Sequence, residues 1–215
     1  MTERSLLPAA TTLGAFALVG VGLVSATFEA TRDRIAENER LSLLRKLQVV
    51  VPAALTDNDL AGDRLQVQRP DLLGAASTTI YRGRKDGKPA ALVVASTVPN
   101  GYAAPIQLLV GVRADGVLTG VRVVAHKETP GLGDKIEEEK SDWILGFSGK
   151  SLGDPPLDKW GVKRDGGLFD QFAGATVTPR AIVATLKNTL IFVRDQGAAL
   201  YEPAPQSSQV AGGSS

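Results

Sequence analysis

Ten residues, Asp170–Pro179, combine small side chains, two hydroxyl groups and the start of a helix. Thr178 suits the N-cap position, and Pro179 suits the first helical position because its missing N–H would be unpaired there. The free N–H groups and positive dipole end of such a helix favour a phosphate at Gly174–Thr178. Gly174 and Ala175 are small enough for an anion to reach the backbone. A plain turn before a helix explains the same pattern, and on pattern alone it is the simpler interpretation.

Residues 170–176, with the sequence DQFAGAT, resemble a known flavin-attachment motif. In the motif Asp-x-x-Ser/Thr-Gly-Ala-Thr, a flavin transferase joins FMN to the threonine through a phosphoester. It occurs in the G subunit of the Rnf ion-translocating electron transport complex and in the C subunit of the sodium-translocating NADH:quinone oxidoreductase. The resemblance implies that Thr176 carries the FMN. Ala173 departs from the motif, which usually has a hydroxyl there.

A second segment, Glu128–Gly133, resembles the Glu-Thr-Pro-Gly-Leu-Gly loop of these flavin domains and favours the Rnf family among them. The residues themselves predict a turn after a strand, with its corner at Pro130-Gly131. Such a loop can present backbone donors and acceptors to the polar edge of an isoalloxazine ring. The resemblance implies that Thr129 and Leu132 contact the ring. A structural turn with an exposed Glu128 is the alternative.

Other residues resemble features of the same family, but their patterns are less specific. Lys163 resembles a family lysine near the flavin, where a cation would stabilise phosphate or reduced-flavin charge, but a solvated lysine fits equally well. Gly101-Tyr102, ahead of an expected strand, resembles a third family feature. His126 is the only histidine, so a histidine-based metal site lacks partners and we expect none. The expected cofactor-binding residues are Thr176 (covalent FMN), Gly174, Ala175, Thr178, Glu128, Thr129, Leu132, Gly133 and Lys163.

Composition narrows the class of protein. A chain of 215 residues with a formal net charge of +1 predicts one domain with appendages. The balanced charge and the absence of a basic stripe argue against nucleic acid as a partner. With no cysteine, the chain has no thiolate chemistry, disulfides or cysteine-ligated iron–sulfur cluster.

An apolar N-terminal segment predicts membrane attachment. Ser5–Phe28 contains no charged residue, and at 1.5 Å per residue it spans roughly 36 Å, enough for a hydrocarbon core of about 30 Å. A signal peptide cleaved after Val24-Ser25-Ala26 is the alternative. We favour a retained anchor because the apolar segment is long for a signal and an amphipathic helix follows it directly.

The orientation of this anchor has two conflicting indications. Arg32, Arg34 and Arg40 follow the apolar segment, so the positive-inside rule weakly places the C-terminal part in the cytoplasm. The family resemblance instead places it in the periplasm of a bacterial inner membrane. Because large domains translocate largely regardless of nearby charge, we expect a single-pass protein with a periplasmic flavin domain.

Four segments are expected: an anchor (1–28), a helical stalk and polar connector (29–69), an FMN-binding domain (70–201) and a disordered tail (202–215). Antiparallel strands with separate helices make the domain α+β, an antiparallel sheet with packed helices. Asp86-Gly87 and Asp115-Gly116 each predict a hairpin turn. The other expected elements are strands Thr78–Arg84, Ala90–Thr97, Ile106–Val112 and Leu118–Ala125, helices Asp134–Phe147 and Pro179–Gln196, and an irregular segment Ser151–Arg164 with a short strand.

The resemblance implies an electron-relay subunit of a membrane complex that couples ferredoxin and NAD oxidoreduction to sodium or proton transport. Thr176 would be an attachment point, so we expect no catalytic side chain and no independent turnover. The implied partners are the other membrane and peripheral subunits, a flavin transferase and membrane lipid. There are two alternatives: a stand-alone FMN-domain sensor or maturation protein, and a cofactor-free envelope scaffold.

Overall fold

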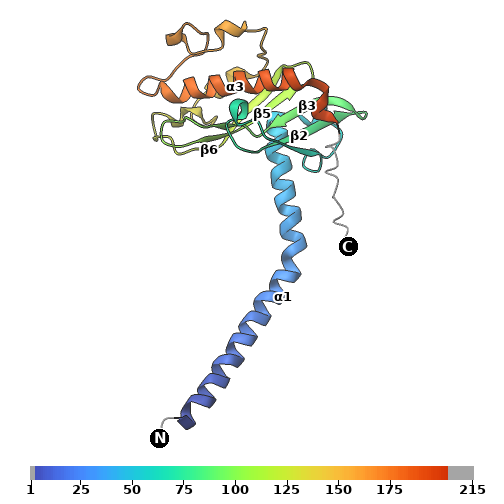
Figure 1. The fold of residues 1–215 in the computed structure, drawn as a ribbon, viewed down its shortest axis with the longest axis vertical. Helices are drawn as coiled ribbons and strands as arrows, with labels where there is room; N and C mark the ends of the chain where they lie inside the picture. Colours follow the sequence, from blue (N-terminus) through green and yellow to red (C-terminus); the bar gives the residue numbers. More distant parts are fainter. Residues whose placement is uncertain (1–2, 203–215) are drawn as a thin grey trace, which may run out of the picture. The chain divides into compact units, whose positions relative to one another are not determined.

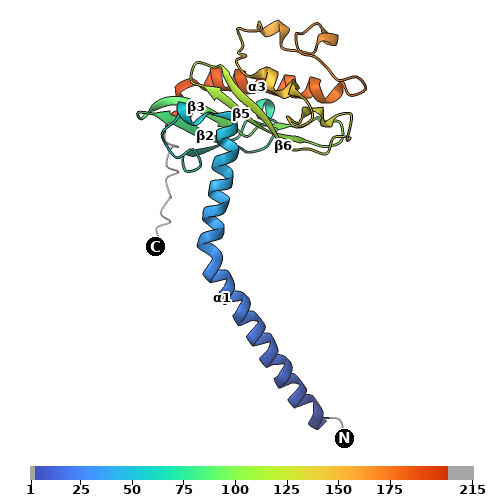
Figure 2. The ribbon, with the colours of Figure 1, turned by 180° about the vertical axis from the view of Figure 1, so that it is seen from behind.

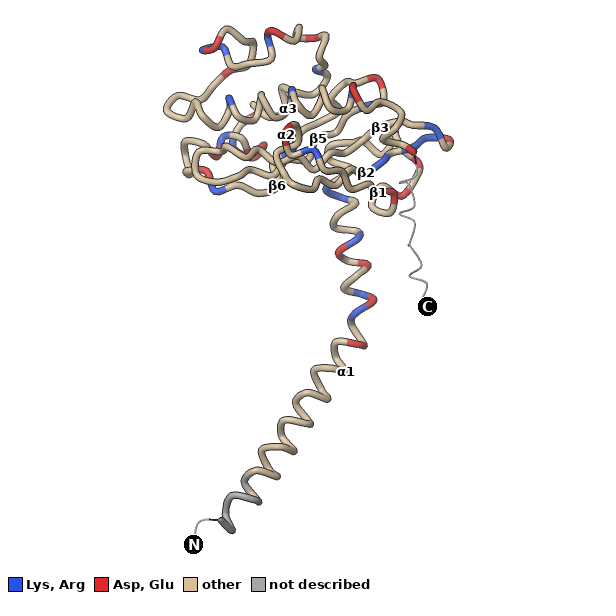
Figure 3. The backbone as a smooth tube through the Cα atoms, viewed as in Figure 1, with Lys and Arg blue, Asp and Glu red and all other residues tan. Residues whose placement is uncertain are grey.

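The computed structural model describes residues 3–202, which divide into two compact units between Leu43 and Leu44. The first unit consists of most of helix α1 (Glu3–Val50). Leu13, Phe16 and Val24 are 75%, 74% and 71% exposed, and a helix that exposes apolar side chains on all sides suits lipid rather than water. By length and composition, the described part of the chain has one helix able to cross a membrane. The helix has no charged residue between Ser5 and Phe28, and Figure 3 shows acidic and basic residues in its later part, where Glu29 is the first of them in the sequence.

The second unit contains a six-stranded antiparallel sheet (Figure 1). Strands β1, β2, β3 and β5 lie in that order, and β5 also pairs with the two-residue β4 and with β6. Both predicted hairpins are confirmed, β2–β3 and β5–β6. Asp86 and Gly87 both have positive φ, 51° and 73°, as a two-residue hairpin turn of type I′ requires. The strands are β1 (Arg64–Val67), β2 (Thr78–Lys85), β3 (Lys88–Val94), β4 (Thr97–Val98), β5 (Ile106–Arg113) and β6 (Leu118–Ala125).

Helix α3 (Val177–Gln196) covers one face of the sheet (Figures 1 and 2). Its apolar residues recur at helical spacing, as predicted, and they pack with the strand side chains in one core. The predicted α+β class is therefore confirmed. The remaining helices are short: α2 (Pro70–Leu73) and the 3₁₀ helices Ala53–Leu55, Asp134–Ile136, Asp142–Phe147, Leu157–Lys159, Lys163–Asp165 and Gly197–Tyr201.

The end of α1 packs on the sheet through two paired glycines. Gly111 and Gly120 lie opposite each other in β5 and β6. A Cβ at Gly111 would lie 2.3 Å from the Val50 carbonyl oxygen, and one at Gly120 would lie 3.2 Å from the Val50 Cα. The Thr119 hydroxyl donates a hydrogen bond to the same carbonyl at 2.5 Å. Two adjacent positions without side chains thus make the space that the helix end occupies.

Residues 44–69 belong to this unit, although the sequence placed them in a stalk and connector. Leu47, Val50 and Val51 are fully buried, and β1 pairs with β2 from Arg64 to Val67. The connector is polar because β1 is an edge strand, whose pattern alternates between exposed and half-buried residues.

Two further predictions were right only in part. Residues 134–147 form two short 3₁₀ helices separated by turns, because the chain there bends to bury Ile136, Ile144 and Phe147 in the core. Residues 151–164 are irregular, as predicted, but they contain isolated bridges and not the predicted short strand, since their polar groups bond within local turns. Of the predicted tail, residues 203–215 lie outside the described part.

Candidate functional site

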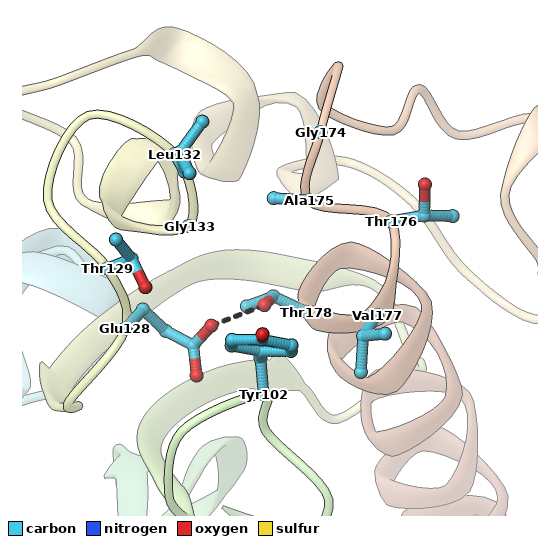
Figure 4. A pocket seen from close by; sticks show the side chains of 10 residues that line it. All are labelled: Tyr102, Glu128, Thr129, Leu132, Gly133, Gly174, Ala175, Thr176, Val177 and Thr178. Atoms are coloured by element: carbon cyan, nitrogen blue, oxygen red, sulfur yellow. Dashed lines mark hydrogen bonds between the residues drawn. The ribbon is translucent and has the colours of Figure 1, made fainter.

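The two motifs singled out in the sequence meet at a pocket of about 370 Å³ in the second unit (Figure 4). One wall comes from the loop after β6, and the other comes from the turn before α3 and the first residues of that helix. A Cβ built on Gly174 would lie 3.6 Å from the Leu132 Cδ2, so the two loops come close together here. The lining residues are Tyr102, Glu128, Thr129, Leu132, Gly133, Gly174, Ala175, Thr176, Val177 and Thr178.

The first loop contains the predicted turn at Thr129–Leu132. The Leu132 N–H donates to the Thr129 carbonyl at 3.1 Å, and Gly131 has φ +78°. Pro130 then occupies the second position and Gly131 the third, which are the residue types that a type II turn favours. The turn leaves the Leu132 side chain 46% exposed at the pocket.

The second loop is a turn anchored in the core. Phe172 is 9% exposed, and its ring packs edge-on against Trp143 with centroids 5.1 Å apart. The Ala175 N–H donates to the Phe172 carbonyl at 3.2 Å, and Gly174 between them has φ +82°. The Trp143 indole N–H also donates to the Asp170 carbonyl at 2.9 Å. The motif therefore forms an ordered turn on an aromatic base.

Helix α3 starts two residues earlier than predicted. Thr176 occupies the N-cap position, with backbone angles already in the helical region, and its side chain makes no capping hydrogen bond. Thr178 lies inside the first turn and is fully buried, so the prediction that it caps the helix was wrong. Its hydroxyl donates across the pocket to Glu128 instead. Pro179 remains acceptable in the first turn, where its missing N–H has no intrahelical partner.

Glu128 is a buried acid, 5% exposed, in contrast to the exposed residue of a plain surface turn. Its Oε2 accepts the Thr178 hydroxyl at 2.5 Å, and its Oε1 accepts the Ala103 N–H at 3.2 Å. A Cβ at Gly133 would lie 2.8 Å from Oε2, and one at Gly101 would lie 3.1 Å from Oε1. Two glycines and two hydrogen bonds therefore surround a carboxylate that forms no ion pair with any side chain that the structure describes.

Basic residues near the second loop are paired with acids outside the pocket. Lys163 Nζ lies 2.6 Å from Asp170 Oδ1 and is not part of the lining, so the structure does not bring this predicted site residue to the others. Arg180 bonds both carboxylate oxygens of Asp165, at 2.6 and 2.8 Å. This hydrogen-bonded guanidinium lowers the pKa of Asp165 from its ordinary value.

Tyr102 lines the pocket, although sequence reasoning gave it no role. It lies between β4 and β5, in a loop that only the fold brings to the other two segments. Its position after Gly101, in a feature shared with the flavin domains, was the signal that could have indicated it.

These residues fit a flavin mononucleotide. Apolar surface for a flat ring comes from Leu132, Ala175, Val177 and Tyr102. The threonine hydroxyls and the backbone of the lining offer hydrogen-bonding partners. None of the ten lining residues is Lys or Arg, so a phosphate depends on the N-terminus of the 20-residue α3. The volume lies in the lower part of the range of about 300–1,000 Å³ for small-molecule sites.

Comparison with known proteins agrees with this fit. Residues 101–191 match the FMN-binding domain family, and residues 1–50 match the RnfG N-terminal region. The fold and the site thus define an FMN-binding domain joined to an N-terminal apolar helix.

Relatives named as the G subunit of the ion-translocating oxidoreductase complex align over most of the chain. The protein of Pseudomonas aeruginosa (strain UCBPP-PA14) is 52% identical over 190 residues, 88% of this chain and 89% of the relative. That of Shewanella amazonensis is 44% identical over 192 residues, 89% of each chain. That of Vibrio cholerae (strain M66-2) is 42% identical over 199 residues, 92% of this chain and 95% of the relative. The chain belongs to the family of the G subunit of the ion-translocating oxidoreductase (Rnf) complex, and the predicted resemblance is confirmed.

Proposed function

We propose that this chain carries FMN bound covalently to Thr176 and relays electrons within an Rnf-type complex. Family membership makes it part of an ion-translocating oxidoreductase with a role in electron transport, and so gives it other subunits as partners. FMN supplies a ring that takes up and releases electrons singly or in pairs. The residues that line the pocket would hold that ring.

One observation carries the assignment of Thr176. This residue lies at the edge of the pocket, is half-buried, and its hydroxyl points away from the Glu128–Thr178 pair (Figure 4). Because it makes no capping bond, attachment to its oxygen breaks no bond of the helix start. A phosphate there would lie beside the first backbone N–H groups of α3.

The attachment step forms a bond between Thr176 Oγ and the phosphorus of the flavin. The hydroxyl loses its proton, and the phosphorus loses its previous substituent. The donor must therefore carry a good leaving group on that phosphorus, as a flavin dinucleotide does. A flavin transferase would bring donor and threonine together.

The largest predicted effect is on attachment itself. Thr176→Ala should remove all covalent FMN from the chain co-expressed with a flavin transferase, while the fold persists because a half-buried hydroxyl contributes little packing. Intact mass and peptide mass measure this, with Thr129→Ala as a control that leaves the attachment oxygen in place. Flavin that stays bound in Thr176→Ala, or moves to Thr178, would contradict the assignment.

The domain is proposed to lie in the periplasm, with α1 as a retained single-pass anchor in the lipid of the inner membrane. The helix continues unbroken through Val24–Ala26 to Val50, which supports a retained anchor. An alkaline phosphatase fused after Tyr201 should therefore be active. An inactive fusion together with an active cytoplasmic reporter at the same position would contradict this orientation.

A further inference from the structure

Tyr102 is more exposed than its apolar neighbours at the pocket. It is 72% exposed, whereas Leu132 is 46% and Val177 is 44% exposed. Aromatic side chains bury about 150–250 Å² each when they are covered, and they dominate binding energies for that reason. A tyrosine ring held beside a pocket and left uncovered thus indicates a surface for a ligand.

The ring lies opposite the first loop. In Figure 4 the Tyr102 ring and the Leu132 side chain occupy opposite sides of the pocket lining, with Thr129 and Glu128 on one flank and Val177 on the other. A flat ring bound between them would have an aliphatic contact on one face and an aromatic contact on the other. A tyrosine ring and an isoalloxazine ring can pack in the offset-stacked arrangement that aromatic pairs prefer.

The backbone on both sides of Tyr102 is held. A Cβ at Gly101 would lie 2.1 Å from the Ala104 carbonyl oxygen, so this tight loop requires glycine there. On the other side, the Ala103 N–H donates to Glu128 Oε1. Because Glu128 also accepts the Thr178 hydroxyl, one buried carboxylate joins the Tyr102 loop to the start of α3.

We propose that Tyr102 stacks on the isoalloxazine ring, on the face opposite Leu132, and that Glu128 is a positioning residue that holds Tyr102 through the Ala103 N–H. This assignment rests on the proposed function, which supplies the FMN. Glu128 would then act by holding the backbone beside Tyr102, and not by touching the phosphate of the FMN.

The test separates ring binding from covalent attachment. In the full-length chain with Thr176→Ala, riboflavin is titrated as the probe, since it has the ring but no phosphate. Tyr102→Leu should raise its Kd roughly 3–10-fold, while Tyr102→Phe, which keeps the aromatic face, should stay within roughly twofold. Leu168→Ala, at an exposed leucine outside the lining, is the matched control and should leave Kd unchanged.

The positioning role is tested by a double-mutant cycle. Glu128→Leu, which removes both acceptor oxygens, should weaken riboflavin binding in the Tyr102 parent and have little further effect in Tyr102→Leu, because both changes remove the same ring contact. Thermal unfolding establishes that each variant is folded; where Glu128→Leu is not, Glu128→Asp, which shortens the side chain by one methylene group and draws its oxygens away from the Ala103 N–H, replaces it in the cycle. Additive effects would overturn the positioning role.

Equal Kd values for Tyr102→Leu and its parent, or no riboflavin binding in the parent, would overturn the Tyr102 assignment. Failure of the proposed function is a different result: the unsubstituted chain would then lack the added mass of FMN, whatever its affinity for riboflavin.

Discussion

The two turns that meet at the pocket have similar backbones but different supports. Thr129–Leu132 has Gly131 at φ +78°, and Phe172–Ala175 has Gly174 at φ +82°. The first turn follows directly on Glu128, whose buried carboxylate bonds two other segments. The second rests on the aromatic ring of Phe172. Hydrogen bonds to a buried carboxylate support the first turn, whereas the second rests mainly on apolar packing, with one hydrogen bond from the Trp143 indole to the Asp170 carbonyl beside it.

The difference suggests separate roles for the two supports. Hydrogen bonds are directional and contribute modest net stability, so they suit the loops that set the geometry around a ring. Burial of an aromatic side chain contributes more free energy without fixing the orientation as closely. We therefore expect the second turn to matter most for folding and the first to matter most for the properties of the bound flavin.

The largest effect on stability should come from the aromatic support. Phe172→Ala should lower the free energy of unfolding by about 3–5 kcal/mol, because it leaves a cavity beside Trp143. Urea denaturation followed by tryptophan fluorescence measures the loss. Phe172→Leu is the control and should retain much of the packing. If Phe172→Ala lowered the free energy of unfolding by less than Thr178→Val does, the comparison of the two supports would be reversed.

Removing the hydrogen bond between Thr178 and Glu128 should lower the free energy of unfolding by less. Thr178→Val keeps the shape of this buried side chain but removes the hydroxyl that Glu128 accepts, so we expect a loss of about 1.5–3 kcal/mol, the range for hydrogen bonds to charged groups. Thr178→Ser measures the methyl group alone. If Thr178→Val were as stable as the unsubstituted chain, the hydrogen bond would not contribute.

The smallest expected loss of stability comes from substitution of the glycine in each turn. Gly131→Ala and Gly174→Ala should each cost roughly 1 kcal/mol for the left-handed backbone, since neither Cβ would meet an atom closer than 3.6 Å. Only Gly174→Ala should also slow FMN attachment, because it alters the segment that the transferase must bind. Unfolding curves and the rate of mass increase test both statements. Equal attachment rates would show that the transferase tolerates the change in the turn.

Local features of the sequence predicted much of the fold. Asp86-Gly87 marks a hairpin because the turn needs positive φ, and the spacing of Ile182, Leu186 and Leu190 marks the buried face of α3. The start of α3 was predicted two residues late because Thr178 bonds to Glu128, a residue far away in the sequence. Residues 134–147 likewise follow the shape of the core and not their own helical pattern.

The same distinction applies to the site. The sequence by itself determined the two motifs, their turns and the hydroxyls that they present, because these depend on neighbouring residues. Only the tertiary structure decided that Lys163 pairs with Asp170 away from the pocket, that Glu128 is buried, and that Tyr102 joins the lining. These facts depend on which distant segments the sheet and α3 bring together, and that is set by the packing of the whole core.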